Sequence, residues 1–289
     1  IWANSKGGEN MRVPIQYIAS SGHTYNLIAD GIRHKSANYH MWDYKVQGTK
    51  LQYGARVADF AKDPATYETE LILTGGERHR QALINALHDD FETDIRNRKT
   101  GRLIWGDYYI DCYIIGSNTT PTDYLTQTSN KISIYAPYPY WVQEYKVELY
   151  PSQESQSGFL DFPFDFPFDF TAPVIGETTV KSDFPYDSEF EMVIFGPAVN
   201  PRVTINGYSY VLYASIPSGA YVVINSRQHT VMQFNTDGTQ SNIFNLRNKT
   251  DSIFKKIPGG NLNIAWDATF GVNITIYRER SEPRVEVRG

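Results

Sequence analysis

Residues 74–115 read TGGERHRQALINALHDDFETDIRNRKTGRLIWGDYYIDCYII, a stretch in which one periodicity gives way to another. In its first half, apolar residues recur every four positions: Leu83, Leu87, Phe91 and Ile95. This spacing places them on one stripe of a helix. Thr74 and Glu77 have the spacing of a capping box, so we expect the helix to begin beside them and to end at Gly101.

The second half of the stretch has the alternation of a β-hairpin. Gly106 and Asp107 form a turn signal after the run 103–105. In the run that follows, four alternate residues share one face: Tyr108, Ile110, Cys112 and Ile114. A helix followed at once by a hairpin predicts one amphipathic helix packed on antiparallel strands.

Further strands are expected on both sides of this stretch, at residues 67–73, 131–136 and 141–150. Residues 13–53 show only short apolar runs between turn signals. No signal-peptide pattern precedes Met11, which we expect to be the natural start. Residues 11–150 are therefore predicted to form an α+β domain.

Residues 161–170 read DFPFDFPFDF, a repeated four-residue unit. Because proline fixes φ and lacks a backbone donor, this segment is neither helix interior nor central strand. We interpret residues 151–172 as an aromatic linker. The phenylalanines are expected to pack against a surface, with Phe162, Phe164, Phe166 and Phe168 more than half buried at alternate positions at least. A spacer whose rings pack locally is the alternative.

After this linker the pattern is that of an antiparallel β-sandwich over residues 173–289. Short strands are expected at close spacing, with Gly-containing turns between several of them. Seven are predicted: 190–195, 202–205, 208–213, 220–225, 230–234, 261–266 and 272–277. The chain as a whole is therefore predicted to be mainly β.

The composition is that of a folded protein, with 41% hydrophobic and 20% charged residues. A net charge of −5 argues against a nucleic-acid binder, which needs a concentrated basic face. Residues 161–191 hold eight acids and one base, whereas residues 192–289 hold ten bases and six acids. This asymmetry fits either head-to-tail contact between copies or a solvated face. No apolar run of about 18 residues occurs, so no membrane span is expected.

Catalytic and metal-binding signatures are missing from the sequence. It contains no nucleophile elbow, no phosphate-binding loop and no His-Glu-x-x-His motif. The six histidines are scattered, and no set of metal ligands is expected. Cys112, the single cysteine, lies in an apolar run and is expected in the core. We therefore predict no catalytic residue, no metal and no cofactor.

Several motifs in order along the chain carry a family resemblance. They are the helix-to-hairpin run 76–112, the aromatic linker, GPAVNP at 196–201, ING at 205–207, AYVVINS at 220–226, FKKIPGGN at 254–261 and RERSEP at 278–283. Together they are similar to the distal tail proteins of siphophages, the phages with long flexible tails. The resemblance covers most of the chain from about residue 60 onward.

This resemblance implies a structural virion protein, from a phage or a prophage. The N-terminal domain would be the belt of a homohexameric ring, and the C-terminal domain a galectin-like β-sandwich. The ring would be a baseplate hub that joins the tail tube protein to the tail tip or a tail-associated lysin-type protein. In some phages it also carries receptor-binding proteins. DNA would pass through without specific binding. The protein would lie in the virion tail, assembled in the bacterial host cytoplasm.

A galectin-like domain raises a second hypothesis, carbohydrate binding for host attachment. Asn200-Pro201-Arg202 resembles part of the galectin sugar motif, and Trp266 is a further candidate. No histidine lies near them, and Asp267-Ala268 follows Trp266 in place of the Gly-x-Glu run. The candidate sugar-site residues are therefore Asn200, Arg202 and Trp266.

A third hypothesis is a tail-associated hydrolase acting on the cell wall. A glycosidase needs two carboxyl groups roughly 5–10 Å apart in a cleft. Asp187, Glu189 and Glu191 are expected on one face of a strand, which favours a solvated face over a catalytic pair.

Overall fold

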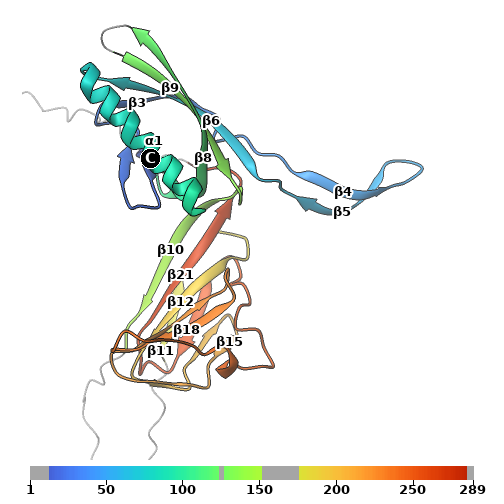
Figure 1. Ribbon diagram of the computed structural model, residues 1–289. Coiled ribbons are helices and arrows are strands. Elements are labelled where there is room, and N and C mark those ends of the chain that lie inside the picture. Colours follow the sequence, from blue (N-terminus) through green and yellow to red (C-terminus); the bar gives the residue numbers. More distant parts are fainter. Residues whose placement is uncertain (1–12, 124–126, 152–175, 285–289) are drawn as a thin grey trace, which may run out of the picture. The chain divides into compact units, whose positions relative to one another are not determined.

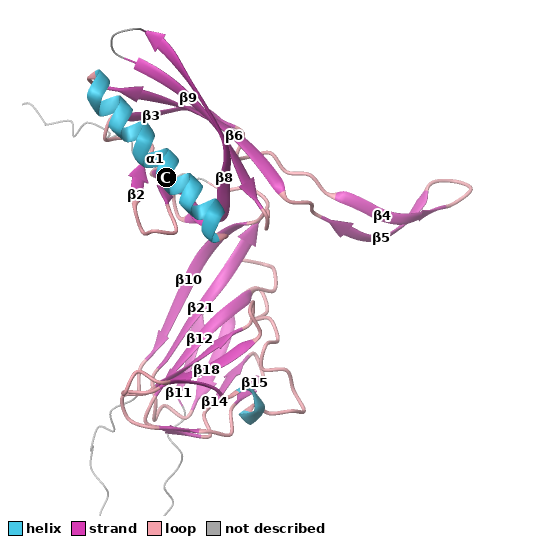
Figure 2. Cartoon of the chain, viewed as in Figure 1, coloured by secondary structure: helices cyan, strands magenta, loops and turns pink. Residues whose placement is uncertain are grey.

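The computed structural model describes residues 13–123, 127–151 and 176–284. Strands dominate it, and a single long helix lies in the first half of the chain, so the mainly β fold class is confirmed (Figure 2). The chain divides into two compact units: residues 1–143 with 279–289, and residues 144–278. Except for residue 151, the predicted linker 151–172 lies outside the described residues, as does the expected burial of its phenylalanines.

Unit 1 holds the helix and the strands of the N-terminal half (Figure 1). Its elements are β1 (Ile15–Ile18), β2 (Thr24–Asn26), β3 (Ile32–Ala37), β4 (Lys45–Lys50), β5 (Ala55–Ala61), β6 (Ala65–Thr74), α1 (Glu77–Asn97), β7 (Gly101–Trp105), β8 (Tyr108–Asp123), β9 (Gln127–Ala136) and the start of β10 (Trp141–Leu149).

The long strand β8 joins two antiparallel sets of strands in unit 1. Its first residues pair with β7, which continues through β1 to β2. Its later residues pair with β9, which continues through β6 to β3. The predicted inner face of β8, from Tyr108 to Ile114, is at most 5% exposed. Helix α1 covers this core with three buried residues, Ile84, Leu87 and Phe91.

The ends of α1 differ from the sequence-based prediction. Thr74 remains the last residue of β6, and both its amide and its hydroxyl donate to the Gly31 carbonyl. The predicted capping box is therefore wrong, and Gly76 is the N-cap without a side-chain cap. At the other end the helix closes on Arg98, which adopts a left-handed conformation with φ 53°. Gly101 instead begins β7, where an added Cβ would meet the Tyr17 hydroxyl.

The regular secondary structure of unit 2 is almost entirely β-strand. Its elements are the end of β10, β11 (Gly176–Val180), β12 (Glu189–Phe195), β13 (Ala198–Val199), β14 (Arg202–Ile205), β15 (Tyr208–Val211), β16 (Ser215–Ile216), β17 (Tyr221–Asn225), β18 (Thr230–Phe234), β19 (Gln240–Asn242), the 3-10 turn η1 (Phe244–Leu246), β20 (Leu262–Trp266) and β21 (Val272–Arg280). All seven strands predicted for this region are present, within a few residues at their ends.

Two antiparallel sheets enclose one core in unit 2. One has the order β19-β18-β17-β12-β21-β10, and the other has the order β11-β20-β14-β15. Inward side chains of both sheets, such as Met192 and Val222 from the first and Val203 and Ile264 from the second, belong to a single buried cluster. This arrangement is the predicted β-sandwich.

Candidate functional site

The described residues offer no assembled catalytic centre. Among them, no three His, Cys, Asp or Glu side chains group together as metal ligands. His88 Nε2 lies 2.8 Å from the Ser117 hydroxyl, but that hydroxyl donates to Asn130 Oδ1 at 2.7 Å. The Ser117 hydroxyl thus donates to Asn130 and not to His88, and no third group orients the histidine as a base among the described contacts. Cys112 is fully buried, and burial raises the pKa of its thiol. No helix in the described part of the chain is long and apolar enough to span a membrane.

The three sugar-site candidates lie in unit 2 without forming a common site. Val203 on β14 pairs directly with Trp266 on β20, so both side chains leave their sheet on the inner face. Arg202 precedes Val203 and faces outward, where it is exposed. Asn200 lies in the turn before β14, with a left-handed φ of 48°. Arg202 and Trp266 therefore cannot contact one sugar ring together, and sugar binding at these residues stays a prediction.

The carboxylates expected on one strand face are engaged in pairs with other side chains. Glu189 accepts from the Ser226 hydroxyl at 2.6 Å and lies 3.1 Å from Lys256 Nζ. Glu191 accepts from Asn225 Nδ2 at 3.0 Å. Asp187 lies before β12 begins. The two strand carboxylates thus hold neighbouring strands and loops in place.

Buried polar groups on α1 form a clamp that sequence reasoning missed. Asp94 is fully buried and accepts from the Tyr17 hydroxyl at 2.6 Å and the Ser20 amide at 2.9 Å. Asp90 accepts from the Tyr25 hydroxyl at 2.5 Å and from Ser21 at 2.9 Å. Burial opposes the charged form of Asp90, but the hydrogen bonds from Tyr25, Ser21 and His23 outweigh it and lower the pKa of this carboxyl. The clamp therefore fixes α1 to the β1–β2 hairpin.

The most unusual surface of unit 1 is the hairpin β4–β5, which projects from the sheet in Figure 1 and is here called the arm (residues 45–61). The register pairs Val46 with Phe60 and Gly48 with Val57, so these residues share one face. Gln47, Asp59, Thr49 and Arg56 pair on the other face. The arm is thus an amphipathic ribbon of two strands.

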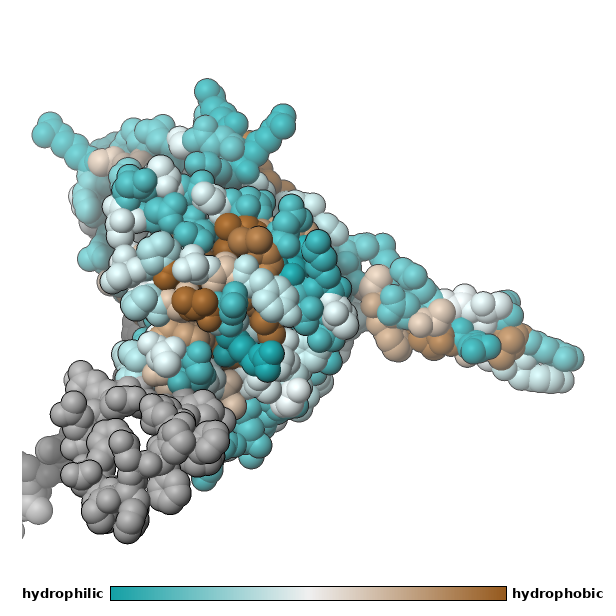
Figure 3. Space-filling view, turned by 90° about the horizontal axis from the view of Figure 1, so that it is seen from below, coloured by the Kyte–Doolittle hydropathy of each residue, from teal (hydrophilic) through white to brown (hydrophobic). Residues whose placement is uncertain are grey.

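The apolar face of the arm is uncovered. Val46, Val57 and Phe60 are between 47% and 60% exposed, and hydrophobic residues are visible along the arm in Figure 3. At the tip, Tyr53 is 88% exposed. A two-stranded hairpin is marginally stable in water by itself, and exposed apolar faces mark interaction surfaces. The sequence did not predict this hairpin, because Val57 and Phe60 lie three residues apart and only the bulge opposite Gln47 and Gly48 brings them to one face.

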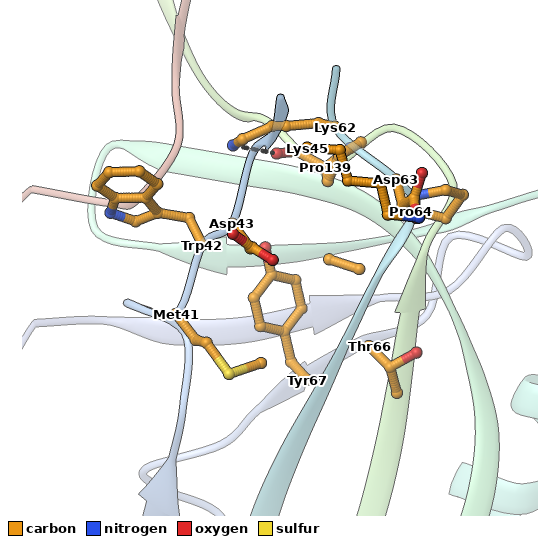
Figure 4. A pocket seen from close by; sticks show the side chains of 11 residues that line it. Met41, Trp42, Asp43, Lys45, Lys62, Asp63, Pro64, Thr66, Tyr67 and Pro139 are labelled. Carbon is orange, nitrogen blue, oxygen red and sulfur yellow. Dashed lines mark hydrogen bonds and ion pairs between the residues drawn. The ribbon is translucent and has the colours of Figure 1, made fainter. Parts of the chain in front are cut away.

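A cavity of about 340 Å³ lies where the arm leaves the sheet. Tyr67 is one of its lining residues and lies between Met41 and Trp42 on one side and Pro64 and Thr66 on the other in Figure 4. Met41 and Trp42 are more than half exposed, whereas Tyr67 is 1% exposed and belongs to the core. The cavity is therefore mostly apolar and open to solvent.

Charged groups surround this cavity. Lys62 Nζ donates to the Pro139 carbonyl at 3.2 Å and lies 4.4 Å from the centre of the Tyr140 ring. Burial lowers the pKa of Lys62. Lys45 forms an ion pair with Asp63. Asp43 also lines the cavity and adds a second, weaker electrostatic interaction with Lys45.

No family model and no curated protein matches the chain. Solved structures do match it in fold. The Dit protein of phage SPP1, described as a paradigm of the hub adsorption apparatus in phages that infect Gram-positive bacteria, matches with a TM-score of 0.56 and 9% identity over 92% of this chain and 99% of that one. Chains of the phage p2 baseplate in its activated conformation match with TM-scores of 0.59 with Ca and 0.61 with Sr, each at 11% identity over 93% of this chain and 99% of that one. The chain therefore shares the fold of these phage hub and baseplate proteins, in agreement with the resemblance seen in the sequence.

Proposed function

We propose, from this shared fold, that the chain is a distal tail protein that acts as a structural hub of a phage tail. Copies of the chain would assemble through unit 1 into a homohexameric ring between the tail tube protein and the tail tip. The likeness extends over nearly the whole chain and over nearly all of each matched structure, so it covers both units. The likeness is one of fold, and the assembly of six copies into a ring is what we propose from it.

The uncovered arm is the observation that carries the proposed self-association. A ribbon with one apolar face loses exposed hydrophobic area only when another surface covers that face. The arm is part of unit 1, the proposed ring-forming unit. In the proposed ring, the apolar face of the arm would be covered by a different patch on the neighbouring copy. Contacts of this head-to-tail kind build closed rings when the rotation between copies closes.

The remaining parts of the proposed role are consistent with the chemistry of the chain. A net charge of −5 suits a conduit through which DNA passes, since a channel rich in lysine and arginine would hold the phosphates. The paired carboxylates of β12 and the hydrogen bond from Ser117 to Asn130 favour a structural protein over a hydrolase. Unit 2, a β-sandwich that we propose to be galectin-like, would carry tail-tip, lysin-type or receptor-binding partners.

Native mass spectrometry tests the self-association. The wild-type chain is expected at six times the mass of one 33.0 kDa copy. A variant with Val46→Thr, Val57→Thr and Phe60→Ser should be a folded monomer, because these side chains touch solvent in a single copy. The matched control, Gln47→Ser with Thr49→Ser on the polar face of the arm, should retain the ring. A wild-type chain that stays monomeric at every concentration and salt condition would refute the hub.

A further inference from the structure

We infer that the tip of the arm, Leu51 and Tyr53, occupies the cavity at the base of the arm of a second copy. This inference rests on the proposed self-association and names the surface that receives the arm. The two elements are a projecting apolar tip and an open apolar cavity, and both are present on every chain.

The tip cannot fill the cavity of its own chain. Strand β4 has six residues, and a strand rises about 3.3 Å per residue, so the tip lies roughly 20 Å from the base of the arm. The pairing continues to Lys50 and Ala55, and the Leu51 amide donates to the Gly54 carbonyl at 3.0 Å. The arm is therefore an extended ribbon with a closed turn, and its tip points away from its own cavity. Only another copy can bring a tip there.

The sizes and polarities of tip and cavity agree. Tyr53 is the most exposed large hydrophobic side chain in the described part of the chain, and Leu51 is half exposed beside it. A cavity of about 340 Å³ lies within the range of pockets that hold small molecules, so an aromatic side chain fits inside it. Trp42 and Met41 form an apolar wall that Tyr53 would cover. Tyrosine suits this position because its ring is apolar and its hydroxyl can remain at a polar rim.

The charges of tip and cavity are also complementary. The tip carries Lys50 and Arg56, and residues 48–58 contain no acid. At the cavity, Lys45 and Asp63 neutralise each other, and Lys62 is held by the Pro139 carbonyl. Asp43 adds a second carboxylate beside Lys45. A tip that enters the cavity therefore brings two cations towards two carboxylates, Asp43 and Asp63, that share Lys45, and this attraction orients the contact.

Disulfide trapping tests this inference. The variant Tyr53→Cys with Thr66→Cys places one thiol at the tip and one at the cavity wall, and the native Cys112 stays fully buried. Under mild oxidation it should give a ladder of cross-linked copies on non-reducing gels. The yield should exceed by about tenfold that of the control Tyr53→Cys with Ala82→Cys, whose second thiol lies on exposed helix surface, because seating raises the local thiol concentration.

The outcomes separate the two proposals. Native mass spectrometry of the same reduced variants reports whether rings form. Rings with a ladder confined to the Thr66→Cys pair support the seating of the tip in the cavity. Rings in which both pairs cross-link equally, or neither does, overturn that seating and leave the hub intact. The absence of rings from the wild-type chain refutes the proposed self-association itself.

Discussion

Two hairpins in this chain share one design and have opposite surroundings. The arm pairs Val46 with Phe60, and the hairpin β14–β15 pairs Val203 with Tyr210 and Ile205 with Tyr208. Val203, Ile205 and Tyr210 are at most 2% exposed, because the other sheet of the sandwich covers them. The corresponding arm residues are about half exposed. A hairpin with one apolar face therefore needs a second surface to pack against. In β14–β15 the same chain provides that surface, whereas in the arm no described residue of the same chain does.

The largest expected effect is a difference in unfolding free energy between substitutions in the two hairpins. Ile205→Ala should lower the free energy of unfolding of unit 2 by about 2–5 kcal/mol, because it opens a cavity in a filled core. Val57→Ala in the arm should change the stability of a monomeric chain by less than about 0.5 kcal/mol. Hydrogen exchange of the β14 and β6 amides, measured by mass spectrometry, gives both values. A large loss from Val57→Ala in monomers would mean that its own chain covers the arm.

The next largest effect on stability is expected at the clamp, whose polar groups fix α1 to the β1–β2 hairpin. Asp90→Asn should destabilise unit 1 near neutral pH by about 1–3 kcal/mol, because buried donors lose their charged acceptor. The pKa of Asp90 is lowered on folding, so its carboxylate contributes stability above the ordinary value of 3.8, and the contribution is lost as the pH falls through the folded-state pKa. The difference between wild type and variant should therefore narrow below about pH 4.

Hydrogen exchange of the α1 amides at several pH values measures this difference. Asp89→Asn is the matched control, since Asp89 is the exposed neighbour on the same helix and should have little effect at any pH. If the two variants behave alike, the hydrogen bonds to Asp90 do not hold the helix. No corresponding pH dependence is expected for the apolar face of the arm.

A smaller effect, on the affinity between copies, is expected when charges at the tip or at the cavity are reversed. Asp43→Lys should weaken the assembly about tenfold, because it places like charges opposite Lys50 and Arg56. Lys50→Glu with Arg56→Glu should weaken it similarly. Combining the three substitutions should restore much of the affinity between copies. Sedimentation of a dilution series in the analytical ultracentrifuge measures this affinity. Additive losses without rescue would show that Asp43 and the tip do not meet.

The sequence predicts the elements whose signals are local. The spacing of Leu87 and Phe91 and the alternation of Ile110 and Cys112 correctly place the helix stripe and the inner face of β8, since both patterns face one core. The capping box fails because Thr74 is held in β6 by Gly31, a partner 43 residues away. Ile95, at the end of the predicted stripe, is 45% exposed, because a spacing of four residues drifts by about 40° per step around an α-helix and the buried position there is Asp94.

The candidate site is less predictable than the fold for the same reason. The clamp of Asp90 and Asp94 depends on partners more than 60 residues distant, so neither aspartate carries a local signal of its burial. The arm carries a local signal only at its turn, Gly54, because its apolar face depends on a bulge in the pairing of β4 with β5. Arg202 and Trp266 are placed on opposite faces by a pairing between β14 and β20, which lie far apart in the sequence.

An effect of similar size is expected from the same substitution in the two turns. Gly54 and Gly207 have φ values of +84° and +81°, and both have open space where a Cβ would be added. Alanine at either position is strained by about 1–2 kcal/mol, because an L side chain rarely adopts this conformation. In the covered hairpin, Gly207→Ala should lower the unfolding free energy of unit 2 by that amount, since the turn and the core unfold together. In the arm, Gly54→Ala should leave the global unfolding of a monomer unchanged, because the strained tip can open locally while the sheet stays folded. Hydrogen exchange of the β4 and β14 amides distinguishes the two cases, and an equal effect on global unfolding would mean that the arm folds as part of the core of unit 1.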